Sequence, residues 1–334
     1  MTWREATAPP EERGLARDEV RLLVARPDSV RHCVFADLAG QLQPGDLLVV
    51  NTSATLPAAL DGRRTDGSPV VVHLSTALDD GTWVVELRPP GRAVGPVVDA
   101  AAGERVALPA GAHLDLLAPY LESSRLWRSA VAVEGPVPAL LARHGRPITY
   151  AYLHGTYPLE AFQTVFARHP GSAEMPSAGR PFSGRVVLDL VARGVTVAPL
   201  LLHTGVSSPE PGEPPRAEPY DVPERTAALV GLTRRSGGRV VAVGTTVTRA
   251  LETLAGVDGT VRPGRGWTDL VLGPERPARV VDGLITGWHT PGASHLQLLA
   301  AVAGPDLVSQ AYDAAERDGG YLWHELGDSC LLLP

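Results

Sequence analysis

The sequence predicts an α/β protein with a mainly parallel sheet and a smaller, inserted all-β domain. Over residues 150–334, apolar runs of strand length alternate with segments of helical periodicity, a pattern typical of parallel sheets. Residues 60–135 instead contain short apolar runs between glycines and prolines, which indicates antiparallel strands in a barrel or sandwich. The chain of 334 residues is long enough for two domains. We therefore predict an α/β domain from residues 1–59 and 136–334 and an inserted β domain at residues 60–135.

The composition is that of a globular protein and excludes some chemistries. Charged residues make up 20% and hydrophobic residues 44% of the chain, and no apolar run approaches the roughly 20 residues that span a bilayer. All 30 basic residues are arginines, so a lysine Schiff base is excluded. The net charge of −7 argues mildly against a large nucleic-acid footprint. The polar N-terminus lacks the apolar core of a signal peptide, which predicts a cytoplasmic protein with no membrane partner.

The two cysteines give no sign of a metal site or a disulfide framework. Cys33 and Cys330 lie at opposite ends of the chain and lack the paired spacing of zinc ligands. We therefore expect two buried thiols and no bound metal.

The first part of the α/β domain contains two predicted strands, at residues 20–25 and 46–50. The second strand is closed by Asn-Thr-Ser at residues 51–53, for which we favour a role in the turn over contact with a ligand. After the inserted domain, helical patterns occur at residues 137–144 and 159–168.

The stretch of residues 171–205 is central to the prediction. Its first part, up to Ser183, is rich in glycine, serine and proline, which predicts a shaped loop. Ser183 is a suitable N-cap for a short helix, and Gly194 marks where that helix ends. The apolar run at residues 195–202 predicts a buried strand, and it ends in the polar turn 203–205. Ligands of α/β proteins bind where parallel strands end in such turns.

The C-terminal half continues the alternation of strands and helices. A proline-rich segment at residues 209–223 predicts a long loop, because proline fixes φ and lacks a backbone N–H. A buried strand at residues 239–243 is followed by the turn 244–246 and a helix, an arrangement that presents free N–H groups to an anion. That helix carries Arg249 and Glu252 one turn apart. The other predicted elements are helices at 223–237, 294–303 and 306–317 and strands at 268–272, 283–286 and 330–333.

Several of these segments together resemble one known family. They occur in that family's order and cover nearly the whole chain, with the inserted β domain the least matched. The segments are R-L-L-V-A (21–25), P-G-D-L-L-V-V-N (44–51), F-Q-T-V-F-A (162–167), G-S-A-E-M-P-S-A-G (171–179), L-L-H-T-G (201–205), A-E-P-Y-D-V (217–222), R-V-V-A-V-G-T-T-V-T-R-A-L-E-T (239–253), L-I-T-G-W-H-T-P-G-A-S (284–294) and G-D-S-C-L-L-L (327–333). On these segments the chain resembles the S-adenosylmethionine:tRNA ribosyltransferase-isomerases of queuosine biosynthesis.

The resemblance implies a barrel-like α/β catalytic domain with an inserted β domain, in a cytoplasmic bacterial enzyme. It implies S-adenosylmethionine as the donor of a ribosyl unit and no metal. The family transfers that unit, rearranged to an epoxycyclopentanediol, to the aminomethyl group of a 7-deazaguanine in tRNA. Adenine and methionine are released.

The resemblance also suggests roles for polar residues in the turns. A base beside the sulfonium must have a pKa near 7, which favours His203 or His289. Glu218 and Glu252 could offset the sulfonium charge or hold ribose hydroxyls, and Arg249 could pair with the methionyl carboxylate or else with Glu252. The residues expected in catalysis are His203, His289 and Glu252. Those expected to bind S-adenosylmethionine are Ser177, Gly179, Thr204, Gly205, Glu218, Gly244, Thr245, Thr246 and Arg249.

The chain departs from the family's pattern mainly in the turns. Residues 52–59 lack two basic residues of the family, and residues 179–183 lack a histidine. The segments 204–209, 216–218 and 287–289 also differ from the family's residues. Two alternatives therefore stand beside tRNA modification: an enzyme that uses S-adenosylmethionine with a different, small acceptor, and a catalytically silent protein that binds S-adenosylmethionine. The sequence does not disclose the acceptor, the oligomeric state or which histidine is the base.

Overall fold

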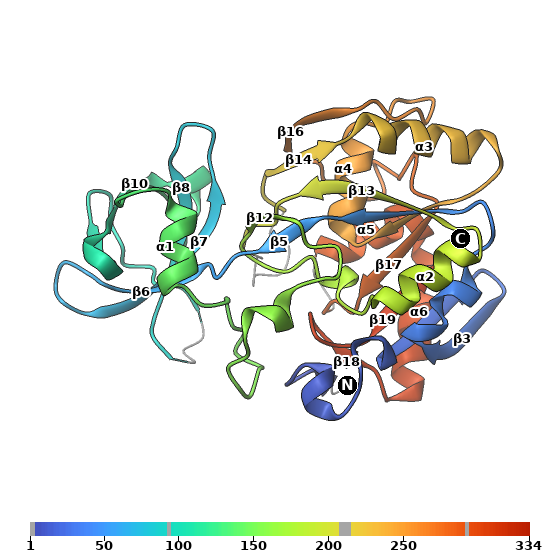
Figure 1. Cartoon of the computed structure of the whole chain (residues 1–334), viewed down its shortest axis with the longest axis horizontal. Helices are drawn as coiled ribbons and strands as arrows, with labels where there is room; N and C mark the ends of the chain where they lie inside the picture. The colour runs from blue at the N-terminus through green and yellow to red at the C-terminus, as the bar shows by residue number, and fades with distance from the viewer. Residues whose placement is uncertain (1–3, 92–94, 207–214, 291–293) are drawn as a thin grey trace.

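The computed structural model describes residues 4–91, 95–206, 215–290 and 294–334. A closed barrel and a large sheet with helices lie side by side in the described chain (Figure 1). The barrel has six antiparallel strands in the order β10-β11-β8-β7-β6-β9. These strands are β6 (Ala59–Arg63), β7 (Pro69–Ala77), β8 (Trp83–Arg88), β9 (Arg105–Ala107), β10 (His113–Pro119) and β11 (Leu126–Ala132). The antiparallel β structure predicted for this part is confirmed, and its limits as a domain stay a prediction.

The barrel is closed around its own apolar core. Val72 and Leu74 of β7 are fully buried in it, as are Val85 and Leu87 of β8. In each strand one residue lies between these two, because the side chains of a strand point alternately to its two faces. The helix α1 (Val137–His144), at the expected position, packs its buried leucines onto the same core.

The second unit is a nine-stranded sheet that is parallel at its centre. Strands β13, β4, β15 and β17 are neighbours in this order, and all three pairs are parallel, as is the pair β19 and β2. The order of the whole sheet is β16-β14-β13-β4-β15-β17-β19-β2-β3. The strands are β2 (Arg21–Arg26), β3 (Ser29–Val34), β4 (Leu47–Asn51), β13 (Thr196–Leu202), β14 (Glu218–Val222), β15 (Val240–Val243), β16 (Gly264–Thr268), β17 (Gly283–Gly287) and β19 (Ser329–Leu332).

Both faces of this sheet are covered. In β4, Leu47 and Val49 belong to one core cluster, whereas Leu48 and Val50 belong to another on the opposite face. This explains why the strand reads as a continuous apolar run. The first face is covered by α3 (Glu224–Arg235), α4 (Thr245–Thr253), α5 (Ser294–Ala303) and α6 (Pro305–Asp318). The second is covered by α2 (Gly184–Ala192) and the 3-10 helix η3 (Phe35–Gln41).

The expected parallel barrel is not what the described strands form. The sheet has ends at β16 and β3, and four of its eight strand pairs are antiparallel. The pair β2 and β3 is antiparallel because the two strands form a tight hairpin, and the last strand, β19, also runs against β17. The closed barrel in this protein is the inserted unit instead.

The prediction of a helix at residues 159–168 was wrong. Only a short 3-10 helix, η6 (Leu159–Phe162), forms there. The side-chain amide of Gln163 bonds both backbone groups of Thr55, accepting from its N–H at 3.0 Å and donating to its carbonyl at 2.8 Å. This pairing holds Gln163 in an extended conformation, which ends the helix.

Two further sequence predictions differ from the structure near the edge strand β16. Part of the expected loop 209–223 forms β14. Pro219 is tolerated there because the pairing of β14 with β13 covers only Tyr220 and Asp221, so its missing N–H interrupts no ladder. Residues 207–214 of that loop lie outside the described residues. The strand expected at 268–272 lies earlier in the chain, as β16. β16 ends at Thr268, and the carbonyls of Thr268 and Leu270 accept hydrogen bonds from Arg249.

Other predictions agree with the structure. Ser183 caps α2 by accepting the Val186 N–H at 3.2 Å. Both cysteines are free; Cys330 is buried as expected, whereas Cys33 is only partly buried. Among the described helices, none has the length and apolar character that crossing a membrane requires. The remaining short strands, β1 (Arg4–Glu5) with β18 (Leu322–Trp323) and β5 (Ser53–Thr55) with β12 (His169–Ser172), form two small parallel pairs.

Candidate active site

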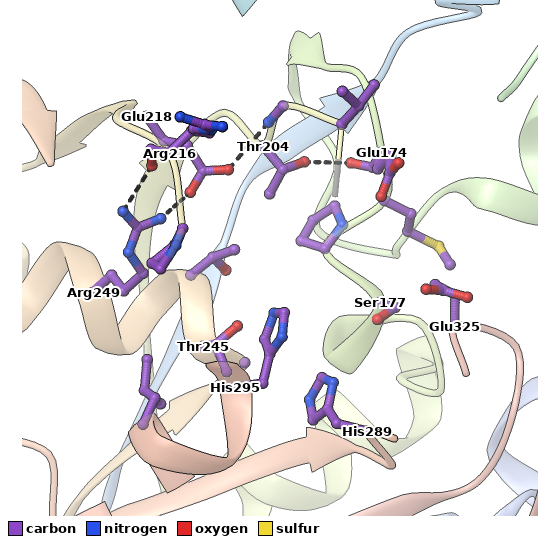
Figure 2. A pocket seen from close by; sticks show the side chains of 18 of the residues that line it. Glu174, Ser177, Thr204, Arg216, Glu218, Thr245, Arg249, His289, His295 and Glu325 are labelled. Atoms are coloured by element: carbon purple, nitrogen blue, oxygen red, sulfur yellow. Dashed lines mark hydrogen bonds and ion pairs between the residues drawn. The ribbon is translucent and has the colours of Figure 1, made fainter. Parts of the chain in front are cut away.

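The turns that follow three parallel strands open onto one cavity of about 510 Å³ (Figure 2). Thr204 and Gly205 reach it from β13, the turn 244–246 from β15, and His289 from β17. Because these strands are parallel, their carboxyl ends meet at one edge of the sheet. The volume is in the usual range for a small-molecule site, roughly 300 to 1,000 Å³.

The barrel forms the opposite wall of this cavity. Ser75 and Thr76 of β7, Val84 of β8 and Leu126 of β11 line it. Ser75 also accepts the Val206 N–H at 2.9 Å, so the turn after β13 is bonded to the barrel. The site therefore includes both units of the chain.

Asn51 shapes the turn after β13. Its side-chain amide donates to the Leu202 carbonyl at 2.8 Å, and its oxygen accepts the N–H groups of Leu202 and Ser53 at 3.1 and 3.0 Å. All three of these hydrogen bonds are made to backbone groups of the protein. Asn51 is therefore a turn residue, as favoured from the sequence, and it does not line the cavity.

The turn at Gly244 directs the start of α4 toward the cavity. Gly244 has φ of +93°, and a Cβ there would lie 3.2 Å from the Cβ of Ala178, so a larger residue would be strained. Gly244, Thr245 and Thr246 all line the cavity, and α4 has no side-chain cap at its N-terminus. Its first N–H groups are oriented as an anion site requires.

His289 is held firmly at the cavity wall. Its Nε2 lies 3.0 Å from Thr286 Oγ1, and its backbone N–H donates to the Tyr312 hydroxyl at 3.2 Å. The preceding Trp288 is buried among aromatic rings, with the Tyr312 ring centroid at 5.0 Å. Burial lowers the pKa of His289 well below its usual value, with smaller contributions from His295 and His324. The imidazole is therefore neutral at pH 7.

His203, the other expected base, does not line the cavity. Its Nδ1 lies 2.7 Å from Ser53 Oγ, which is itself 2.6 Å from Ser172 Oγ. Its ring packs against Gly171, where any Cβ would lie within 2.6 Å of ring atoms. Burial lowers the pKa of His203, and His169 adds to the effect. These contacts favour a structural role.

Arg249 lies at the cavity but is already engaged. It forms an ion pair with Glu218, and their side chains are only 5% and 15% exposed. Its other donors bond the carbonyls of Leu270 at 3.1 Å and of Arg216 and Thr268 at 2.9 Å. Figure 2 shows the contacts of Arg249 with Glu218 and Arg216. Four of the five guanidinium N–H groups are used in this way. The partner of Arg249 is therefore Glu218 rather than Glu252, and little of it is left for a substrate carboxylate.

Glu218 joins Arg249 to the turn after β13. Its other carboxylate oxygen accepts the Gly205 N–H at 3.1 Å. Burial raises the pKa of Glu218, and the charge of Arg249 and these hydrogen bonds counter part of the increase.

Glu252, expected in catalysis, lies outside the cavity lining. Its side chain is fully buried and accepts the backbone N–H groups of Arg279, Val280 and Val281 at 2.8 to 3.0 Å. Arg276 pairs with the same carboxylate at 3.4 Å. The carboxylate fastens residues 276–281 to α4, and it has no route to a substrate in the cavity.

Replacing Glu252 with glutamine should destabilise the fold without a direct effect on the site. One oxygen becomes an NH₂ group that faces backbone donors, and we expect a loss of about 2 kcal/mol in the free energy of unfolding. Denaturant unfolding would measure it. A reaction rate that falls at full stability would contradict this structural role.

The other residues predicted to bind S-adenosylmethionine also include some that line the cavity and one that does not. Ser177 lines the cavity, at the 3-10 helix η7 (Ser177–Gly179). Gly179 is buried and does not line it; a Cβ there would lie 3.3 Å from Thr164. The predicted residues that line the cavity are Ser177, Thr204, Gly205, Glu218, Gly244, Thr245, Thr246, Arg249 and His289.

Several lining residues were not selected from the sequence. Glu174 lies in the matched segment 171–179, so position in that segment was an available signal. Glu325 follows β18, and burial raises its pKa to about 7; the Tyr152 hydroxyl donates to it. His295 is the second residue of α5 and stacks on His289. Nothing local in the sequence marks Glu325 or His295. Within the described ranges, no three His, Cys, Asp or Glu side chains are grouped as a metal site needs.

Comparisons with known proteins agree on one family. The model of the family described as "Queuosine biosynthesis protein" matches residues 3–332. The chain is 37% identical over 332 residues to the S-adenosylmethionine:tRNA ribosyltransferase-isomerase of Acaryochloris marina, covering 95% of this chain and 88% of that protein. It is also 37% identical to the protein of this name from Symbiobacterium thermophilum, over 95% and 94% of the two chains.

A solved structure is similar as well. It is the crystal structure of S-adenosylmethionine tRNA ribosyltransferase from Thermotoga maritima, 28% identical to this chain. The match covers 95% of this chain and 93% of that chain, with a TM-score of 0.50.

Proposed function

The chain belongs to the queuosine biosynthesis family, and on this premise we propose that it is an S-adenosylmethionine:tRNA ribosyltransferase-isomerase. It takes the ribosyl part of S-adenosylmethionine and attaches it, rearranged to an epoxycyclopentanediol, to the aminomethyl group of a 7-deazaguanine in tRNA. Adenine and methionine leave. Such an enzyme works in the cytoplasm, where its tRNA is modified.

One observation carries the proposal: the turns after β13, β15 and β17 meet in a single cavity with a neutral, rigidly held histidine. Separate turns on distant faces would offer no common site for the nucleoside, the sulfonium and the amino acid part of one donor. Their convergence supports a single site that holds the whole molecule.

The cavity suits S-adenosylmethionine in size and charge. A volume of about 510 Å³ can enclose a nucleoside with an amino acid side chain. Glu174 and Glu325 lie on the side away from Arg249, where carboxylates can offset the positive sulfur and the α-ammonium group (Figure 2). The N–H groups at Thr245 and Thr246 are suited to the α-carboxylate.

His289 is the base in this proposal. The donor supplies a sulfonium, which acidifies the carbons bonded to it. A neutral imidazole whose position is set by Thr286 and Tyr312 can remove a proton from the ribose carbon next to sulfur. Tyr120, Val84 and Leu126 of the barrel side exclude water from the same space.

The tRNA acceptor is favoured over a small acceptor or a silent binding protein. Curated relatives of one name align with 95% of this chain. The family model matches residues 3–332, a range that includes the turns that differ from the family's pattern. No feature of the described residues specifically supports a small acceptor or a silent binding protein.

Incubation with S-adenosylmethionine and tRNA tests the proposal directly. We expect adenine and methionine to be released, by chromatography, only with tRNA that carries 7-aminomethyl-7-deazaguanine. The same tRNA with unmodified guanine is the matched control. Release without RNA would support an enzyme with a small acceptor, and tight binding with no release would support a silent binder.

A further inference from the structure

Glu325 faces the cavity without a cation beside it. Its side chain is partly buried and lines the cavity, and no arginine or histidine of the described chain forms an ion pair with it. By contrast, Glu218 is paired with Arg249 and Glu252 with Arg276. A carboxylate that is shielded from water is stabilised by a cationic partner. A cation that enters the cavity can therefore supply the partner that Glu325 lacks.

The residue before Glu325 has a left-handed backbone. His324 has φ of +73°, which is uncommon for a residue other than glycine, and its carbonyl accepts the Gly327 N–H at 3.0 Å. His324 does not compensate the charge of its neighbour. Its Nε2 lies 3.4 Å from Glu5, and burial lowers its pKa. Strained backbone of this kind is concentrated at ligand sites, which supports a functional role for the residue that follows.

Tyr152 holds the carboxylate from a separate segment of the chain. Its hydroxyl donates to Oε2 of Glu325. Its ring stacks on those of Tyr150 and His324, with centroids 5.4 and 4.5 Å apart and planes within 8° and 13°. Burial raises the pKa of Tyr150, and the charges of Glu174 and Glu325 add to the increase, so both carboxylates lie near the stack. The stack fixes the Tyr152 ring and therefore the hydroxyl that bonds Glu325.

Glu325 lies near the proposed base and away from the start of α4. Together with Ser177 and Gly287 it also lines a small cavity of about 10 Å³, and Gly287 ends β17 two residues before His289. Figure 2 shows Glu325 near Ser177 and across the cavity from Thr245. With the α-carboxylate at Thr245, the α-ammonium group stays at that end, because both are bonded to one carbon. The sulfur, two methylene groups farther along, is the cation that reaches Glu325.

We propose that Glu325 is the specificity-determining residue that makes this site prefer a sulfonium to an uncharged thioether, and that Tyr152 is the positioning residue for its carboxylate. This inference rests on the proposed function, in which S-adenosylmethionine is the donor. It deepens that function by naming the group that recognises the charge on sulfur. Because the sulfur leaves as uncharged methionine, the contact favours the donor over the product.

Calorimetry with two ligands tests the inference without turnover. S-adenosylmethionine and S-adenosylhomocysteine share the nucleoside and the amino acid, and differ in the methyl group that gives sulfur its charge. At pH 8 the carboxyl group of Glu325 is ionised, because its pKa is about 7. We expect the wild type to bind the sulfonium at least about tenfold more tightly than the thioether. Glu325→Gln keeps an acceptor for Tyr152, and it should reduce this preference about tenfold while leaving thioether affinity nearly unchanged.

Three further variants separate charge from position. Tyr152→Phe keeps the stacked ring but removes the hydroxyl, so we expect a smaller loss of preference, about threefold. Glu325→Asp retains the charge and should retain part of the preference that Glu325→Gln loses. Tyr157→Phe is the matched control, because Tyr157 packs on the same apolar cluster as Tyr152 but does not line the cavity. Its preference should equal that of the wild type.

The outcomes are distinguishable from those of the activity test. A wild type that binds both ligands equally would overturn the inference, as would variants at Glu325 and Tyr152 that lower both affinities by the same factor. Tyr152→Phe and Glu325→Asp keep the test available where Glu325→Gln does not fold. A wild type that shows the expected preference but releases no adenine with tRNA would refute the proposed function and leave this inference standing.

Discussion

Changing His289 to glutamine should reduce adenine release by about 10² to 10⁴-fold, the usual contribution of a general base. Glutamine can still donate to Thr286 Oγ1, so the turn after β17 should keep its form. Binding of S-adenosylmethionine should change little, because the base acts in the transition state. Single-turnover kinetics and calorimetry on the same preparation separate the two effects.

His203→Gln is the natural comparison for this experiment. Glutamine can keep the hydrogen bond to Ser53, and His203 does not line the cavity. We expect a rate within a few fold of the wild type. The opposite ranking of the two variants would make His203 the base and would remove the role proposed for His289.

The second large effect is expected for Arg249→Leu, and it concerns stability. The change leaves Glu218 buried without its cation and leaves the carbonyls of Arg216, Thr268 and Leu270 without their donor. Breaking a buried ion pair on one side costs about 3 to 5 kcal/mol. Thermal and denaturant unfolding should show a loss of this size.

Two control variants separate the effect of the unpaired buried charge from the effect of losing an arginine. Arg265→Leu removes an arginine that is 84% exposed and paired with Asp221, and it should change the free energy of unfolding by less than about 0.5 kcal/mol. Adding Glu218→Gln to Arg249→Leu should restore part of the lost stability, because the unpaired charge is gone. If Arg249 instead holds the substrate carboxylate, Arg249→Leu would weaken binding while leaving the unfolding curve in place.

Local patterns along the chain were sufficient to predict most of the helices and strands. Ser183 predicted the start of α2 because its hydroxyl caps the helix within three residues. The apolar run ending at Leu202 predicted β13, whose Ala198, Leu200 and Leu202 are buried in one core cluster, whereas Pro199 on the other face is exposed. The same patterns were insufficient at Gln163, where a contact 108 residues away in sequence replaces the helix.

The sequence by itself determined the family, most of the strands and helices, and the turns at residues 203–205, 244–246 and 289, from which residues reach the cavity. These are properties of short segments, set by periodicity, caps and glycines. Only the tertiary structure decided which polar side chains point into that cavity. His203, Arg249 and Glu252 all lie in matched segments, but each satisfies its charge or hydrogen bonds within the protein. Burial imposes those pairings on residues far apart in the chain, so no local pattern can reveal them.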